Sequence, residues 1–283
     1  MPSLTSLTIY PIKSCAGIAL AQAEVTSLGL AAGGVRDREW MLVDADGNLL
    51  PQRETPAMAL IVPRITGDEL IVDAPGSASL SIPLPLATLE HAQTLDVRVW
   101  DDVVQASDCG SDAAAWFSRF LGVPCRLVRF HPQAQRLASA KWTNGRDVLT
   151  LFSDGFPMLI VSEASLADLN QRLAAQGRAA LPMNRFRPNL VIDGIEAFEE
   201  DYAATIRIGA ACLQPVKPCA RCPMPSIDQS TGKFGPDPLD ILQTYRANPL
   251  VDGGITFGMN AILLDGENTL LQIGQQAEIE LAF

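Results

Sequence analysis

The feature that most constrains this chain is a series of short apolar runs in its N-terminal part, each ended by glycine, proline or aspartate. The runs cover residues 6–12, 40–43, 59–63, 69–72, 78–82 and 97–104. Each has the length of an ordinary strand and is too short for a typical globular helix. The pair Asp46-Gly47 is also a hairpin signal. Short strands at near-regular spacing favour a β-barrel or a β-sandwich.

Helices join the strands further along the chain. Residues 111–121 carry aromatic side chains at helical spacing and can be capped by Ser111 or Asp112, so we expect a helix with a core-facing stripe. Residues 158–161 are expected to form a buried strand that runs directly into a helix opened by Ser162. The polar residues 133–146 are typical of a loop.

Composition limits the function classes. The 283 residues are 48% hydrophobic and 19% charged, so the chain can bury a full core. A net charge of −11 disfavours general binding to nucleic acid or to an anionic membrane. The chain has no apolar run of membrane-spanning length, and its first residues do not resemble a signal peptide. Because the cysteines are unevenly spaced, we expect a reducing compartment and a cytoplasmic location.

The basic residues are concentrated in a few short segments. If the fold brings these segments together, an acidic protein would hold one cationic pocket suited to an anionic, phosphate-bearing ligand. The alternative is that they are ordinary surface residues that never meet. The residues concerned are Lys13, Arg36, Arg38, Arg53, Arg185, Arg187, Lys217 and Arg221.

A pair of cysteines, Cys219 and Cys222, lies between cationic neighbours, which favour the reactive thiolate form. A structural zinc site needs four ligands, but the other four cysteines are single and the only histidines are His91 and His131. Prolines crowd the pair, which disfavours a redox motif at the start of a helix. Two explanations remain open. The cysteines are packed thiols in a loop, or one is a soft ligand to a metal whose other ligands belong to a cofactor.

Several segments, taken in order, resemble one family. They are residues 10–15, 36–40, 162–170, 186–189, 219–222 and 257–258. This set is similar to the MOSC-domain proteins that carry an N-terminal β-barrel extension, such as the mitochondrial amidoxime reducing components and their bacterial counterparts. The resemblance implies an α+β, predominantly β fold with a few helices. It also implies a smaller N-terminal β domain at residues 1–124 and a β-barrel-like MOSC domain at residues 125–283.

The same resemblance implies a molybdenum cofactor, a molybdopterin. Cys222 would be the metal ligand and the catalytic residue, because a soft thiolate suits this metal. Cys219 would not be a ligand. The positions matching the family's cofactor-binding motifs are Lys13, Ser14, Arg38, Ser162, Arg187 and Asn189. Because Lys13 and Cys222 must then share one pocket, we expect the N-terminal strand to contribute to the second domain.

The implied activity is the reduction of N-hydroxylated small molecules such as amidoximes and hydroxylamines. No cysteine follows Cys222 and no glycine-rich dinucleotide motif follows a strand, so electrons would come from a separate ferredoxin-, flavin- or cytochrome-type protein. Residues 223–225 are Pro-Met-Pro, where the family often has paired hydroxyl residues. Two other functions stay open: sulfur transfer through a cysteine persulfide, and carriage of the molybdenum cofactor.

Overall fold

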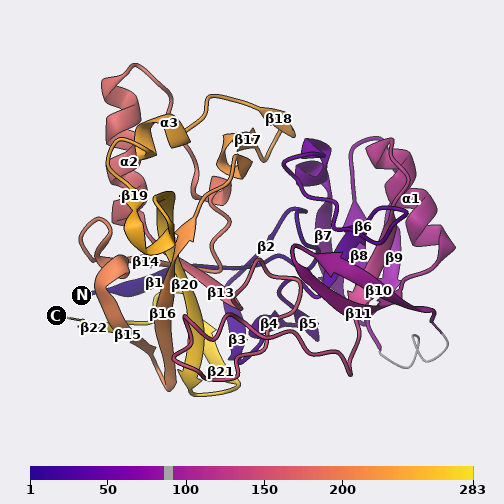
Figure 1. Cartoon of the computed structure of the whole chain (residues 1–283), viewed down its shortest axis with the longest axis horizontal. Coiled ribbons are helices and arrows are strands. Elements are labelled where there is room, and N and C mark those ends of the chain that lie inside the picture. Colours follow the sequence, from indigo (N-terminus) through magenta and orange to yellow (C-terminus); the bar gives the residue numbers. More distant parts are fainter. Residues whose placement is uncertain (86–91, 283) are drawn as a thin grey trace.

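The computed structural model describes residues 1–85 and 92–282, and strands predominate in it. This confirms the predicted α+β, mainly β class. The molecule has two lobes, with both chain ends in the lobe farther from helix α1 (Figure 1). None of the helices in the described part is long and apolar enough to cross a membrane.

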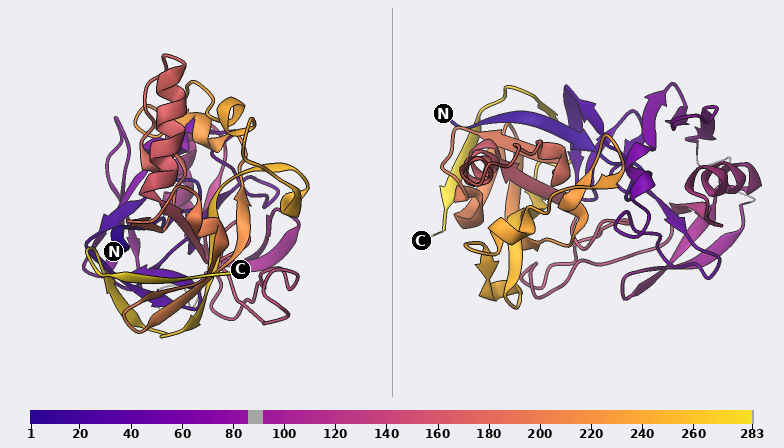
Figure 2. Two further views of the ribbon diagram at one scale, coloured as in Figure 1. Left: turned by 90° about the vertical axis from the view of Figure 1, so that its left-hand side faces the viewer. Right: turned by 90° about the horizontal axis from the view of Figure 1, so that it is seen from above.

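The larger lobe is built on one sheet whose strands follow the order β2-β1-β14-β13-β20-β16-β15-β22, with β19 paired to β20. Helix α2 stands over one end of this curved sheet (Figure 2). The strands are β1 (Ser3–Ile9), β2 (Ile18–Leu20), β13 (Met158–Ser162), β14 (Leu190–Asp193), β15 (Ala203–Ile208), β16 (Ala211–Ala220), β19 (Ala247–Asn248), β20 (Gly254–Asp265) and β22 (Ala277–Leu281). The helices are α2 (Glu163–Ala175) and α3 (Leu239–Leu242).

The smaller lobe contains helix α1 (Ser111–Leu121) and two sheets, ordered β10-β11-β12-β6 and β7-β8-β9. Its strands are β6 (Trp40–Val43), β7 (Val62–Thr66), β8 (Glu69–Asp73), β9 (Leu80–Pro83), β10 (Thr94–Val99), β11 (Asp102–Asp108) and β12 (Arg126–Phe130). A further sheet, β21-β3-β4-β5, joins β3 (Gln22–Thr26), β4 (Gly29–Ala32) and β5 (Val35–Arg36) to β21 (Thr269–Gln272), and a hairpin pairs β17 (Ile227–Asp228) with β18 (Lys233–Phe234).

The N-terminal strand belongs to the larger lobe, as the shared pocket required. Strand β1 pairs antiparallel with β14, with Ser3 opposite Asp193. Strand β12 begins just after residue 125 and pairs with β6 and β11, so the sheet of the smaller lobe extends past that position. One continuous apolar cluster includes Leu4 of β1 and Phe117 of α1, which joins the two lobes into one packed body.

The two long helices lie where the sequence placed them, but one cap differs. Helix α1 spans residues 111–121, yet its N-cap is Gly110, and neither Ser111 nor Asp112 makes a capping hydrogen bond. The reason is that Gly110 has a φ of 94°, a backbone conformation in which glycine avoids the clash of a Cβ atom. Helix α2 begins after Ser162, whose side chain accepts a hydrogen bond from the Ser165 amide.

The predicted strand at residues 59–63 is split. Residues 59 and 60 belong to the end of the 3₁₀ helix Pro56–Leu60, which has proline in its first turn. Strand β7 begins only at Val62. The predicted strand at residues 6–12 also ends early, at Ile9. The chain then leaves the main sheet, and Lys13 donates its amide to the Trp40 carbonyl at 2.8 Å. This crossing carries Lys13 from the larger lobe to the edge of the smaller one.

Candidate functional site

A cavity of about 200 Å³ lies where segments from the two lobes meet. Its described lining includes seven cationic side chains and one carboxylate, Asp154. The cationic residues are Lys13, Arg38, Arg53, Arg185, Arg187, Lys217 and Arg221. The predicted convergence of the basic segments is confirmed for these seven. Arg36, on β5, lies outside the cavity.

Backbone strain is concentrated at this cavity. Ser14, Arg38, Trp100 and Arg187 have φ values of 71°, 50°, 56° and 55°, and all four line it. They are four of the eight non-glycine residues with positive φ in the described ranges. Each such residue costs roughly 1–3 kcal/mol, and such residues persist where the surrounding structure over-determines them, commonly at ligand sites. The strain therefore marks this cavity as the functional site on grounds independent of its charge.

Lys13 and Asp154 form the contact between the lobes at one side of the cavity. The Lys13 Nζ lies 2.6 Å from Asp154 Oδ1, and the Trp100 indole donates to the same oxygen at 3.1 Å. Burial lowers the pKa of Lys13 below its usual value, and Asp154 opposes that effect. Removal of bulk water would raise the pKa of Asp154, but the charge and hydrogen bond of Lys13 hold it well below its usual range. The Asp154 side chain is 77% exposed, which limits the effect of burial on this pKa, and solvent also screens the charge of Lys13.

Arg38 is held in place by three groups, one of which is the Arg187 carbonyl, to which its Nη2 donates at 3.4 Å. Its Nη1 donates to the buried carboxylate of Asp37 and, at 3.0 Å, to Asn189 Oδ1. The amide of Asn189 is engaged at both of its polar atoms: its oxygen also accepts from the Leu159 N–H at 3.1 Å, and its nitrogen donates to the Thr8 carbonyl at 3.1 Å. Asn189 therefore orients Arg38 and ties β13 to β1. Ser14, by contrast, is buried, and within the described ranges its hydroxyl has no hydrogen-bond partner.

Arg187 is a buried cation that has no anionic partner in the described part of the chain. It is 6% exposed, and its side chain makes no hydrogen bond or ion pair with residues 1–85 or 92–282. Its guanidinium stacks on the Tyr10 ring at 4.2 Å, and that ring also contacts Arg38 at 4.5 Å. Burial lowers the pKa of Arg187, and the neighbouring Arg38 charge lowers it further. An anionic ligand would supply the missing partner.

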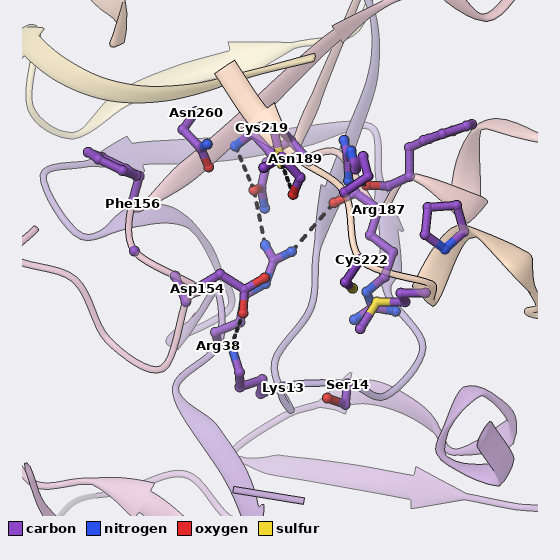
Figure 3. A pocket seen from close by; sticks show the side chains of 18 of the residues that line it. Lys13, Ser14, Arg38, Asp154, Phe156, Arg187, Asn189, Cys219, Cys222 and Asn260 are labelled. Carbon is purple, nitrogen blue, oxygen red and sulfur yellow. Dashed lines mark hydrogen bonds and ion pairs between the residues drawn. The ribbon is translucent and has the colours of Figure 1, made fainter. Parts of the chain in front are cut away.

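The cysteine pair lies at the end of β16 and just beyond it, and both residues line the cavity. Between them, Arg221 donates to the carbonyls of Phe257 and Phe186, each at 2.9 Å, which fixes this turn against β20. Cys219 packs beside an apolar cluster, and burial raises its pKa. Figure 3 shows Cys219 beside Asn189 and Cys222 well apart from it, on the side of Ser14.

The lining fits an anionic cofactor that brings most of its own metal ligands. The buried atoms Arg185 Nε and Ser153 Oγ both belong to lining residues, and neither has a hydrogen-bond partner in the described structure. Together with the unpaired Arg187, they provide donors for phosphate oxygens. No group of three or more His, Cys, Asp or Glu side chains in residues 1–85 and 92–282 could hold a metal ion. A metal at Cys222 would therefore take its remaining ligands from the cofactor.

One predicted cofactor residue lies elsewhere. Ser162 is fully buried, caps α2, and contacts Ser165 at 2.7 Å between the two hydroxyls. Its amide donates to Glu200 Oε1 at 3.1 Å, so it belongs to a buried polar cluster of its own and does not line the cavity. Of the predicted set, the cavity brings together Cys222, Lys13, Ser14, Arg38, Arg187 and Asn189.

Trp100, Asp154 and Asn260 are among the residues of the cavity that sequence reasoning missed. Asp154 lies in an irregular segment just before β13, and its acidic character in a short Ser-Asp-Gly turn was the only available signal. Trp100 occupies the tip of the β10–β11 hairpin, where its positive φ is invisible in sequence. Asn260 lies within β20 and carries no distinguishing pattern.

Comparison with known proteins defines the class of protein. Residues 1–124 match the MOSC N-terminal beta barrel domain, and residues 147–278 match the MOSC domain. The chain is 38% identical over 248 residues to mitochondrial amidoxime reducing component 2 of Bos taurus, covering 86% of this chain and 72% of that protein. It is 36% identical over 249 residues to mitochondrial amidoxime-reducing component 1 of Homo sapiens, covering 86% and 72%. This chain belongs to the MOSC-domain family that contains the amidoxime reducing components.

Proposed function

We propose that this protein is a molybdenum-cofactor-dependent reductase of N-hydroxylated small molecules, such as amidoximes and hydroxylamines. The observation that carries the proposal is the cavity itself, where Cys222 lies among cations that have too few protein anions. The names of the relatives support the same substrate class. The proposal thus joins a thiol ligand, an anion-binding wall and a family resemblance at one place in the fold.

The residues of this chain would divide the work between binding and orientation. Lys13, Arg38 and Arg187 would hold the cofactor phosphate by charge-assisted hydrogen bonds, and the Ser14 hydroxyl would add a neutral donor. Cys222 would complete the sulfur ligation of the metal. When bound, the cofactor would supply a two-electron centre that can take the oxygen of an N-hydroxyl group.

Asp154 would act on Lys13 rather than as an acid. With its pKa held low by Lys13, its carboxylate is ionised at neutral pH and is a poor proton donor. It therefore keeps the Lys13 ammonium charged and directed along the cavity wall. Reducing electrons would come from a separate ferredoxin-, flavin- or cytochrome-type protein, and we propose a cytoplasmic location for both partners.

The sulfur-transfer alternative has less support. A persulfide carrier needs a reactive thiolate, but burial raises the pKa of Cys219 and favours its neutral thiol. Cys222 lies apart from Cys219 and lines the cavity among the cations, where a thiolate could reach the metal of an anionic cofactor.

The test compares three proteins from a host that makes the molybdenum cofactor: wild type, Cys222→Ser and Cys219→Ser. We expect stoichiometric molybdenum and pterin in wild type and in Cys219→Ser. The molybdenum content of Cys222→Ser should be lower. Benzamidoxime reduction driven by a reduced viologen dye removes the need for the electron partner, and it should follow the molybdenum content. Equal molybdenum and equal activity in Cys222→Ser would refute the proposed role of this cysteine.

A further inference from the structure

One end of the cavity is built differently from the rest. Figure 3 places Phe156 and Asn260 at one end and Lys13 and Ser14 at the other. The Asn260 amide donates to the Lys217 carbonyl at 3.2 Å, and the Lys217 Nζ lies 6.0 Å from the centroid of the Phe156 ring. Lys217 therefore belongs to the Phe156 end, away from the residues to which we assign the cofactor phosphate.

Lys217 is a half-buried cation whose charge is not neutralised. Its Nζ makes no hydrogen bond or ion pair with the described residues and contacts only aromatic rings, those of Phe156 and, at 5.6 Å, Trp142. Ring contacts attract a partly buried ammonium only weakly and leave its three donors unused. An anion at this end of the cavity would recover those hydrogen bonds.

The walls around Lys217 are apolar and firmly packed. Phe156, at this end, and two further lining residues, Met158 and Leu159, are each less than 10% exposed. Phe156 and Trp142 also belong to one small apolar cluster with Ile262, so the wall is part of the core. Such a surface suits a flat aromatic ring. The single lysine beside it supplies one positive charge, which matches the single negative charge of a carboxylate.

We propose that Lys217, Phe156 and Asn260 form a subsite for a carboxylate carried on an aromatic N-hydroxylated substrate, an inference that rests on the proposed function. The substrate would lie with its ring against Phe156 and its carboxylate on Lys217. Its N-hydroxyl end would extend toward Cys222. Lys217 is thus a specificity-determining residue that selects acidic aromatic substrates over neutral ones.

The test uses matched neutral and acidic compounds with the cofactor-loaded enzyme. Benzamidoxime and 4-carboxybenzamidoxime differ only in the carboxylate, and the two product amidines can be measured by calorimetry without turnover. We expect wild type to favour the carboxylated compound at least about tenfold in kcat/KM and in amidine affinity, the size of a typical hydrogen bond to a charged group. Lys217→Met should reduce both ratios to about one.

Lys141 offers a matched control. Its Nζ lies 5.1 Å from the same Trp142 ring, but the residue is exposed and does not line the cavity. Lys141→Met should therefore keep the wild-type ratios. Raising the salt concentration should weaken the binding of 4-carboxybenzamidine to wild type far more than that of benzamidine, and this measurement needs no variant.

Three results would overturn the subsite. One is a wild type that shows no preference for the acidic compound, and a second is a preference that survives in Lys217→Met. The third is a loss of molybdenum in Lys217→Met as large as in Lys13→Met, which would place Lys217 at the cofactor. Failure of the proposed function looks different, because neither amidoxime would then be reduced. The two amidine affinities would still decide the subsite.

Discussion

Two buried arginines allow a test of whether Arg187 serves the fold or a ligand. Arg187 and Arg129 each stack on an aromatic ring, at 4.2 Å on Tyr10 and at 4.7 Å on Trp40. Both are nearly inaccessible to solvent. They differ in their partners: Arg129 pairs with the buried Glu39 at 2.6 Å and donates to the Leu84 carbonyl, whereas Arg187 has no anionic partner among the described residues.

This difference predicts opposite effects of the same substitution on the cofactor-free protein. Arg129→Met should lower the free energy of unfolding by about 3–5 kcal/mol, because the Glu39 carboxylate would be left buried without its cation. Arg187→Met should raise it by about 1 kcal/mol. The several kcal/mol lost on burying an unpaired cation exceed the roughly 2 kcal/mol of its ring contact, and access of water through the cavity reduces the difference.

Urea unfolding of both variants, purified from a host that cannot make the molybdenum cofactor, measures these changes. When Arg187→Met is made in a cofactor-producing host, it should bind less cofactor than wild type, although its cofactor-free form is the more stable of the two. The reasoning is refuted if Arg187→Met destabilises the cofactor-free protein as much as Arg129→Met does. That result would mean that Arg187 is held by the fold and not reserved for a ligand.

Three further predictions concern the frame around the site. Gly258→Ala should destabilise by about 3 kcal/mol in urea unfolding, because its Cβ would stand 2.7 Å from the Ile160 carbonyl at a φ of 77°; an unchanged midpoint would contradict this. Asn189→Ala should lower the free energy of unfolding by about 3 kcal/mol and also lower the cofactor content, because Arg38 loses an acceptor. Full cofactor content in this variant would argue against the role of Asn189 in orienting Arg38. Burial raises the pKa of Glu200 above its usual 4.5, so the stability it contributes is present below pH 4.5 and is lost as pH rises through the raised pKa. Urea midpoints from pH 4.5 to 8 should therefore fall less in Glu200→Gln than in wild type, and parallel curves would exclude this group.

Local sequence signals predicted the elements well where one residue type decides the conformation. Helix α1 occupies the residues expected from its aromatic spacing, and α2 starts directly after its N-cap, Ser162, as the capping pattern indicated. The same local signal limited what could be said about function. A serine after a strand is equally suited to cap a helix or to bind phosphate, and only its position outside the cavity separates these roles.

The sequence by itself determined the mainly β fold, the paired cysteines and the clustering of basic residues in short segments, because hydrophobic periodicity and composition are local properties. Only the tertiary structure decided that seven of the eight basic residues singled out in the sequence converge on the cavity, while Arg36 does not. It also decided that Asn189 is committed to orienting Arg38, and that Asp154 is the one described carboxylate in the cavity. These outcomes depend on strands distant in sequence, such as β1 beside β14, and on backbone angles that local propensity disfavours.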